Sequence, residues 1–209
     1  MKNIEYFYSA HSAFAYIGSE KLNEICVTHG AKLIHRPIAL SPVVEAVGGL
    51  SFAARTQAHV DYYFGREIER WAELRGVDIL SHRPTHHDNA LELSNGMLIA
   101  SLDTDVDTDA LAHAVLRAHW RDDIDLCDPA ALTQAAAQVN VDAKPLLDAA
   151  LGAGVQARHH ANTQEAIARN VFGSPTYVVD GDMFYGQDHL ELVARALHRP
   201  FAPSRFKNP

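Results

Sequence analysis

The sequence predicts an α/β fold in which a mixed four-stranded sheet with helices on its faces is interrupted by a large all-helical insertion. Strand-like runs occur only near the two ends of the chain, at residues 4–8, 32–37, 176–179 and 183–185. From about residue 51 to residue 154, apolar side chains instead recur at three- and four-residue steps, as on one helix face. We therefore expect a discontinuous domain, 1–45 and 155–209, around a helical insertion domain, 46–154.

The chain opens with a strand, a helix and a second strand. The run from Ile4 to Tyr8 is rich in strand-forming side chains, and an apolar helical stripe then begins at Ser12. Gly30 is a plausible helix stop, and the run from Lys32 to Pro37 follows as the second strand. This order favours parallel pairing of the two strands through a right-handed crossover.

The insertion is predicted to be a series of amphipathic helices. An apolar stripe runs from Val60 to Trp71 among charged neighbours. Each of the next three expected helices starts near an aspartate, which suits the positive end of a helix. These helices are Asp109 to Trp120, Asp128 to Gln138 and Asp142 to Leu151.

The chain returns to strands near its end. After a helix at about 155–170, the run Thr176 to Val179 is rich in strand formers, and Asp180-Gly181 is a hairpin turn signal. The returning strand is Met183 to Tyr185, and a last helix is expected from about Gln187 to Leu197. The hairpin completes the four-stranded sheet.

Charge and composition limit the classes of partner that the protein can have. The formal net charge of −8 disfavours nucleic acid and anionic membranes as partners, and no apolar run is long enough to cross a bilayer. No secretory signal pattern opens the chain. The only cysteines, Cys26 and Cys127, are far apart and outside any Cys-x-x-Cys motif, as expected for free thiols in a reducing compartment. We therefore expect a cytoplasmic protein.

The segment Ser9 to Ser12 lies at the switch from the first strand to the first helix. A helix N-terminus presents unpaired N–H groups and a partial positive charge, so it can stabilise an anion such as a thiolate. The Ser12 hydroxyl would add a hydrogen-bond donor for that thiolate. The alternative is that Ser12 is only a helix cap.

Two further segments would converge on Ser12 in such a fold. A cis bond before Pro175 would expose the backbone of Ser174 to a peptide-like ligand, although many ordinary loops contain Ser-Pro. The segment from Tyr185 to Asp188 starts the last helix. Asp188 either caps this helix or pairs with a ligand ammonium group, while helix N–H groups bind the ligand carboxylate.

The histidines and an aspartate-rich run do not predict a metal site. The sequence holds 13 histidines, but the pairs His86-His87 and His159-His160 lack the spacing of a tetrahedral ligand set, so structural or surface roles are expected. The run from Asp103 to Asp109 lacks the glycine and glutamate of a calcium loop. His11 is the exception, because it either tunes the site electrostatically or packs beneath the helix start.

Together these segments resemble a known family. The segment Tyr6 to Ala15 aligns without gaps with the active-site opening of DsbA-like thioredoxin proteins, and Ser12 and Ala15 stand where dithiol members place their cysteines. The stretch Ala166 to Leu197 resembles 2-hydroxychromene-2-carboxylate isomerases, relatives of the kappa-class glutathione transferases, as do Arg70-Trp71-Ala72 and Gly76-Val77. The resemblance implies a thioredoxin-like fold of the DsbA-like, kappa-class type.

The resemblance also implies the roles of the site residues. Ser12 would be catalytic and would hold the sulfur of glutathione, the implied cofactor, as a thiolate. Ser174 would bind the cysteinyl backbone beside a cis Pro175. Gln187 and Asp188 would bind the γ-glutamyl group, and Tyr185 and Gly186 would also belong to the glutathione-binding site. A homodimer is implied as well.

The sequence departs from the isomerase pattern at two places. The isomerases carry a Lys-Ala-Thr-Gly-Asn loop whose lysine and asparagine face the substrate, and here Glu45 to Gly49 takes its place. A glutamate would repel a carboxylate substrate, unless Arg36 or Arg55 compensates. Ala13 replaces the usual proline.

The leading hypothesis is a glutathione-dependent isomerase acting on 2-hydroxychromene-2-carboxylate or a related unsaturated 2-oxo acid, by reversible thiolate addition to an activated C=C bond. The alternatives are a kappa-type glutathione transferase or peroxidase and a non-catalytic thiol-binding protein. A dithiol oxidoreductase is disfavoured because neither Ser12 nor Ala15 carries a thiol.

Overall fold

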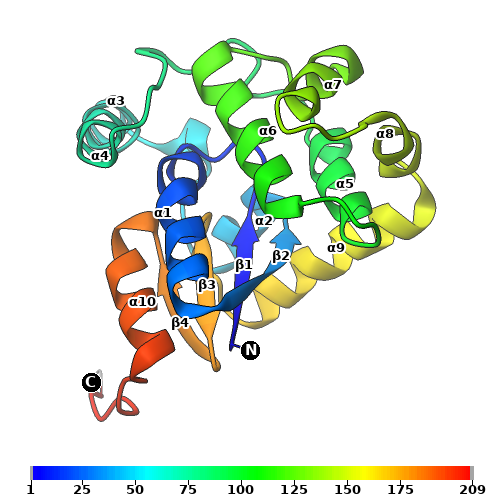
Figure 1. The fold of residues 1–209 in the computed structure, drawn as a ribbon. Helices are drawn as coiled ribbons and strands as arrows, with labels where there is room; N and C mark the ends of the chain where they lie inside the picture. Colours follow the sequence, from blue (N-terminus) through cyan, green and yellow to red (C-terminus); the bar gives the residue numbers. More distant parts are fainter. Residues whose placement is uncertain (1, 208–209) are drawn as a thin grey trace.

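The computed structural model describes residues 2–207 and is built on a four-stranded mixed sheet in the order β2-β1-β3-β4 (Figure 1). The strands are β1 (Lys2–Tyr8), β2 (Ala31–Pro37), β3 (Thr176–Val179) and β4 (Asp182–Tyr185). Strand β1 pairs with β2 in parallel, while β3 runs antiparallel to both of its neighbours. The mixed sheet expected from the sequence is confirmed, and it joins the two ends of the chain.

Helices cover both faces of this sheet and extend beyond it. The α-helices of the structure are α1 (Ala13–His29), α2 (Leu40–Ala46), α3 (Gln57–Asp61), α4 (Glu67–Arg75), α5 (Glu92–Ser101), α6 (Thr108–Asp122), α7 (Pro129–Ala137), α8 (Lys144–Ala150), α9 (Ala153–Ala168) and α10 (Leu190–His198). Helices α1 and α10 lie on one face and α9 on the other, and the remaining helices sit mostly beyond one end of the strands (Figure 1). No helix within residues 2–207 is both long and apolar enough to span a membrane.

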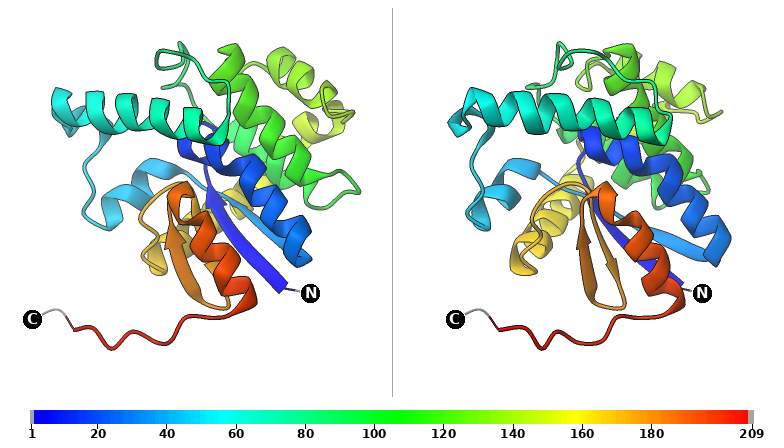
Figure 2. Two further views of the ribbon diagram at one scale, coloured as in Figure 1. Left: turned by 60° about the vertical axis from the view of Figure 1, so that its left-hand side comes forward. Right: turned by 90° about the vertical axis from the view of Figure 1, so that its left-hand side faces the viewer.

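Helices α3 and α4 are parts of one rod. A π-helical segment, Tyr62–Arg66, joins them without a break, so residues 57–75 form a single long helix across the top of the molecule (Figure 2). The rod ends at Gly76, whose φ of 68° lies in the left-handed region that glycine adopts without steric cost. Short π segments are often found at functional sites.

The alternation of side chains along β1 builds two cores. Ile4, Tyr6 and Tyr8 are buried on the side of α1, where the rings of Tyr6 and Tyr8 stack at 4.1 Å. Phe7 points to the opposite side and packs with Val178 and other residues of a smaller core. Because both faces are buried, the register of β1 is fixed.

The start and end of α1 follow the local sequence. The Ser12 hydroxyl accepts a hydrogen bond from the N–H of Ala15 at 3.2 Å, so Ser12 is the helix N-cap. Gly30, at φ 58°, ends the helix in the left-handed conformation. Both boundaries expected from the sequence are confirmed.

Other boundaries differ from those predicted. The last helix begins at Leu190 rather than Gln187, because Gln187–His189 forms a 3₁₀ turn before it. Residues 77–91 form an irregular connection within the block expected to be mostly helical. Gly76 ends the preceding helix and Pro84 cannot donate a helical hydrogen bond. The domain limits at 45/46 and 154/155 stay predictions.

A buried asparagine joins the insertion to the sheet. Asn95, on α5, is fully buried, and its Oδ1 accepts the N–H of Ala10 at 3.1 Å. Its Nδ2 lies 3.1 Å from the carbonyl oxygen of Ile38 and 3.1 Å from Nε2 of His159. One side chain therefore positions the turns that follow β1 and β2.

Replacing Asn95 by leucine is expected to lower the free energy of unfolding by about 3 kcal/mol, because the buried N–H of Ala10 and carbonyl of Ile38 lose their partner. Urea unfolding followed by circular dichroism measures this change. Gln164→Leu, at an exposed position on α9, is the matched control and should change the free energy by less than about 0.5 kcal/mol. A wild-type midpoint for Asn95→Leu would contradict the role given to this side chain.

Candidate active site

The turn from Ser9 to Ser12 is held at every residue. The N–H of Ser9 donates to Oγ of Ser174 at 3.1 Å, and the Ala10 N–H donates to Asn95 as described. The carbonyl of His11 accepts a hydrogen bond from Nε1 of Trp120 at 2.8 Å, and the N–H of Ser12 donates to the Ser9 carbonyl at 3.0 Å. The N-terminus of α1 is thus presented by a rigid turn.

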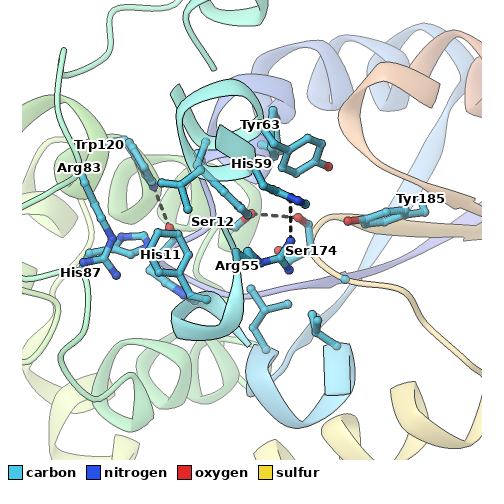
Figure 3. Close-up of a pocket in the computed structure, with 18 residues that line it drawn as sticks. His11, Ser12, Arg55, His59, Tyr63, Arg83, His87, Trp120, Ser174 and Tyr185 are labelled. Carbon is cyan, nitrogen blue, oxygen red and sulfur yellow. Dashed lines mark hydrogen bonds between the residues drawn. The ribbon is translucent and has the colours of Figure 1, made fainter. Parts of the chain in front are cut away.

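The Ser12 hydroxyl lies against the peptide bond that joins Ser174 to Pro175. Its Oγ donates to the carbonyl oxygen of Ser174 at 3.1 Å, and the Ser174–Pro175 bond is cis, as the sequence suggested (Figure 3). Ser174 stands just before β3, so the sheet places these two serines together. The structure therefore brings together three of the residues singled out in the sequence.

A hollow of about 310 Å³ opens over Ser12, and we call it the large hollow. Its apolar and aromatic walls come from α1, α2, the 3₁₀ turn Phe52–Ala54, the rod 57–75 and the end of α6. Its polar lining residues are His11, Ser12, Arg55, His59, Tyr63, Arg83, His87, Ser174 and Tyr185 (Figure 3). No carboxylate side chain lines it within residues 2–207, so the large hollow is electrostatically suited to an anion.

Of the two arginines considered from the sequence, Arg55 is the one that lines the large hollow. Its Nη1 lies 2.9 Å from Nε2 of His59, its guanidinium is 5.1 Å from the Phe64 ring centre, and its buried Nε has no partner among residues 2–207. Arg36, the other arginine considered from the sequence, lies elsewhere and contacts acidic side chains. Glu45, expected to face the substrate, is exposed and outside the lining of the large hollow. The Glu45 carboxylate is therefore not part of the pocket wall.

Arg83, His87 and Trp120 line the large hollow and were not identified from the sequence. Arg83 stacks over the Phe52 ring at 4.9 Å and pairs with Asp88. Arg83 and His87 come from the irregular connection 77–91, which carries no periodic signal to place its side chains. The sequence drew attention only to the pair His86-His87, and the structural or surface role expected for His87 stays a prediction, although the residue lines the large hollow.

Three histidines form a cluster beside Ser12. Nδ1 of His11 lies 2.9 Å from Oγ of Ser9, and the His11 and His87 rings are 4.7 Å apart. Nδ1 of His87 lies 2.9 Å from Nε2 of His119, which is fully buried on α6. The cluster thus links the large hollow to the interior of the insertion.

The environment of this cluster favours neutral imidazoles. Burial, followed by the nearby His119 and Arg83, lowers the pKa of His11 to about 4. Burial, followed by His11, His119 and Arg83, lowers the pKa of His87 to about 2. Burial also lowers the pKa of His119. At neutral pH these side chains are uncharged hydrogen-bonding groups.

A second, smaller hollow of about 90 Å³ adjoins the first, and we call it the small hollow. The two share Phe14, Tyr63, Ser174 and Tyr185. The remaining lining residues of the small hollow are Glu67, Trp71, Gly186, Gln187 and Asp188. All four residues from Tyr185 to Asp188 therefore meet at one place, next to Ser174. In contrast to the large hollow, the small hollow carries two carboxylates.

Gln187 and Asp188 differ in accessibility. Gln187 is 1% exposed, its Oε1 accepts a hydrogen bond from Nε of Arg75 at 3.2 Å, and its Nε2 has no partner among residues 2–207. The side chain of Asp188 is about half exposed and lies 3.6 Å from the His189 ring. Asp188 caps neither the 3₁₀ turn nor α10, so the capping alternative is wrong.

The cysteines and the other paired histidines are outside the lining of the two hollows. Neither cysteine lines them, and burial raises the pKa of the Cys26 thiol to about 12. His86 approaches Asp125, His159 bonds Asn95, and His160 is exposed. Within the described part of the chain, no three histidine, cysteine or acidic side chains are grouped to hold a metal ion.

The family of this protein is shown by a match over nearly the whole chain. Residues 3–198 match the family of the DSBA-like thioredoxin domain. This chain belongs to that family. The match spans both the sheet and the helical insertion, so the thioredoxin-like fold with a helical insertion expected from the sequence is confirmed.

Several relatives of this DSBA-like protein carry the same name. It is 24% identical over 196 residues to a 2-hydroxychromene-2-carboxylate isomerase of Pseudomonas sp. (strain C18), covering 93% of this chain and 89% of the relative. It is 25% identical over 193 residues to an isomerase of that name from Sphingobium xenophagum, covering 92% and 96% of the two chains. The resemblance noticed in the sequence is confirmed.

Solved structures share the fold. A 2-hydroxychromene-2-carboxylate isomerase structure superposes with a TM-score of 0.79 at 22% identity, over 94% of this chain and 95% of the other. The cytosolic disulfide reductase DsbM of Pseudomonas aeruginosa, in a structure with GSH, gives a TM-score of 0.63 at 16% identity, over 95% and 93%.

Acid is expected to destabilise the DSBA-like protein through its buried histidines. His11 and His87 have folded-state pKa values of about 4 and 2, below the unfolded value of about 6.5, so stability is full above pH 6.5 and is lost as the pH falls toward 4. Each group contributes about 1.4 kcal/mol per pH unit in this window.

Urea unfolding at pH 7, 6 and 5 measures this loss. His87→Gln should make the decline shallower by about 1.4 kcal/mol per pH unit, whereas His160→Gln, at an exposed position, should leave it unchanged. A decline equally steep in wild type and His87→Gln would show that His87 is not held neutral in the folded protein.

Proposed function

We propose that this DSBA-like protein is a glutathione-dependent isomerase that acts on 2-hydroxychromene-2-carboxylate or a related unsaturated 2-oxo acid. The observation that carries the proposal is the hydrogen bond from Ser12 to the Ser174 carbonyl, at the wall shared by a cationic and an acidic hollow. The names of the relatives and the GSH in the DsbM structure support the same reading.

The residues around the small hollow fit a tripeptide thiol. The carbonyl of Ser174 would accept the N–H of a cysteinyl backbone, and this exchange would free the Ser12 hydroxyl to donate to the sulfur. Asp188 would pair with the γ-glutamyl ammonium group. The unpartnered Nε2 of Gln187 would donate a hydrogen bond to the carboxylate of the same γ-glutamyl group. The polar groups of the chain at this hollow thus match the polar groups of glutathione.

Bound there, glutathione would supply a thiolate that adds reversibly to the activated C=C bond of the substrate. The chain contributes the electrostatics. Ser12 and the N-terminal N–H groups of α1 stabilise negative charge, as they do for low-pKa cysteines in similar positions. Walls such as Phe14 and Phe64 exclude water, which strengthens these interactions.

The large hollow would hold the substrate. An unsaturated 2-oxo acid carries a carboxylate and develops negative charge on its oxo oxygen when a nucleophile adds to the C=C bond. Arg55 and Arg83 supply two positive charges, and no acidic residue within 2–207 lines this hollow to oppose them. The aromatic ring of such a substrate would pack on Phe52, Phe64 and Trp120.

An activity assay tests the proposal directly. Purified protein is mixed with 2-hydroxychromene-2-carboxylate with and without glutathione, and ring opening is followed by absorbance. Turnover that requires glutathione is expected. Conjugation of chlorodinitrobenzene without chromene isomerisation would instead indicate a kappa-type transferase. The absence of both activities and of any thermal shift with glutathione would indicate a non-catalytic protein. The homodimer implied by the resemblance stays a prediction, and light scattering of the purified protein would measure its mass in solution.

Ser12→Ala is expected to lower kcat roughly 10- to 100-fold, because a hydrogen bond to a charged sulfur contributes about 1.5–3 kcal/mol. The glutathione affinity should change little. Ser12 also caps α1, so stability falls by about 1 kcal/mol. Asp107→Ala is the matched control, because it removes the N-cap of α6 far from the pocket. An unchanged kcat in Ser12→Ala would sink the catalytic assignment.

Arg55→Met should raise the KM for the chromene about 10-fold with a smaller effect on kcat, because it removes a charged donor from the carboxylate. Methionine keeps the apolar contact with Phe64. Arg66→Met is the control, since Arg66 is exposed and pairs with Glu69 at 2.9 Å on the same rod. Equal KM values for the two variants would exclude Arg55 as the carboxylate ligand.

A further inference from the structure

We propose that His87 is the proton acceptor and donor of the large hollow, and that His119 is a positioning residue that fixes the tautomer of His87. The proposal deepens the isomerase function above and rests on it. It assigns a role to the histidine cluster, which that function leaves unexplained.

The hydrogen bonds decide which ring nitrogens carry protons. Nδ1 of His119 lies 3.0 Å from the carbonyl oxygen of Ile124, and a carbonyl can only accept, so this Nδ1 holds a proton. His119 is fully buried and neutral, and its Nε2 is therefore an acceptor. Its partner at 2.9 Å is Nδ1 of His87, which must donate. The Nε2 of His87 is left with a lone pair.

This lone pair is available to a ligand. Nε2 of His87 has no hydrogen-bond partner among residues 2–207, and the ring lines the large hollow. His87 and His11 also line a further hollow of about 280 Å³ on the side of α2 and α5, so the two rings stand between the reaction space and a second opening. That opening gives protons a route to solvent.

The ring is held in place. Trp120 meets it edge-on, with ring centres 5.3 Å apart, and the His119 ring stacks at 5.2 Å. The charged and titratable groups that act on His87 are His11, His119, Arg83 and Asp88. Burial, followed by the charges of His11, His119 and Arg83, disfavours imidazolium at His87, and an anionic substrate in the large hollow would raise the pKa of His87.

The proposed substrate needs such a group. A 2-hydroxychromene-2-carboxylate is a cyclic hemiketal, so ring opening breaks the bond from C2 to the ring oxygen. Nε2 of His87 takes the proton of the C2 hydroxyl, the O–H electron pair forms the ketone C=O, and the C2–O electrons move to the phenolate oxygen. The imidazolium then returns its proton to that oxygen. Atoms and charge balance without a further reactant.

Kinetics of four variants test the assignment. His87→Gln should lower kcat about 100-fold with KM changed less than about 3-fold, since it removes a general acid and base. His119→Phe should lower kcat as well, because His87 loses its fixed tautomer, whereas His119→Gln keeps a donor for Ile124 and an acceptor for His87 and should restore most of kcat. His86→Gln, next in the chain and exposed, is the control and should behave as wild type.

Nitrogen-15 NMR of histidine-labelled protein tests the tautomers without any activity. His87, identified by the signals missing in His87→Gln, should show a protonated Nδ1 and a bare Nε2, and His119→Phe should abolish this preference. Salicylate, which bears a hydroxyl beside its carboxylate, should shift the Nε2 signal, whereas benzoate should shift it much less. These readouts remain interpretable if the protein does not isomerise chromenes, so failure of the proposed function is distinguishable.

Two results would overturn the inference. One is a protonated Nε2 on His87 in the wild type, or equal responses to salicylate and benzoate. The other is a wild-type kcat for His87→Gln in an enzyme that does turn over the chromene.

Discussion

The site depends on a reciprocal pair of hydrogen bonds between two distant turns. The Ser12 hydroxyl donates to the Ser174 carbonyl across 162 positions of sequence, and the Ser174 hydroxyl accepts the Ser9 N–H across 165. Pairing of β1 with β3 brings the two turns to the same end of the sheet. The same Ser12 oxygen caps α1, so the start of the helix and the peptide bond before Pro175 are fixed by one atom.

Around this pair the chain separates its charges. The large hollow is lined by arginines and histidines, while the small hollow next to it is lined by Glu67 and Asp188. Burial keeps the pKa of His11 and His87 low, so the cationic character of the large hollow comes from Arg55 and Arg83. A ligand with an ammonium group at one end and an anionic partner at the other fits this division without a buried unpaired charge.

The site residues that could be located from the sequence are those whose position is determined by the strand or helix pattern next to them. Ser12 and the segment 185–188 stand at the ends of periodic elements, so strand and helix patterns alone brought them together. The position of His87 depends instead on an irregular connection with no periodicity, and its tautomer depends on a carbonyl of another turn. Glu45 was misplaced because alignment of a short loop does not fix which side chains turn inward. Tertiary contacts, not propensity, decide such positions.

The π-helical segment Tyr62–Arg66 has a geometric consequence. In a regular α-helix, residues four apart drift by about 40° around the axis at each step, so His59 and Trp71 would face different directions. A wider π turn cancels part of this drift. The residues four apart along the rod accordingly face the two hollows in turn. His59 and Tyr63 line the large hollow, and Tyr63, Glu67 and Trp71 line the small one. The rod is therefore a wall common to both hollows, and a shift of the rod along its axis would change the shape of the large and the small hollow together.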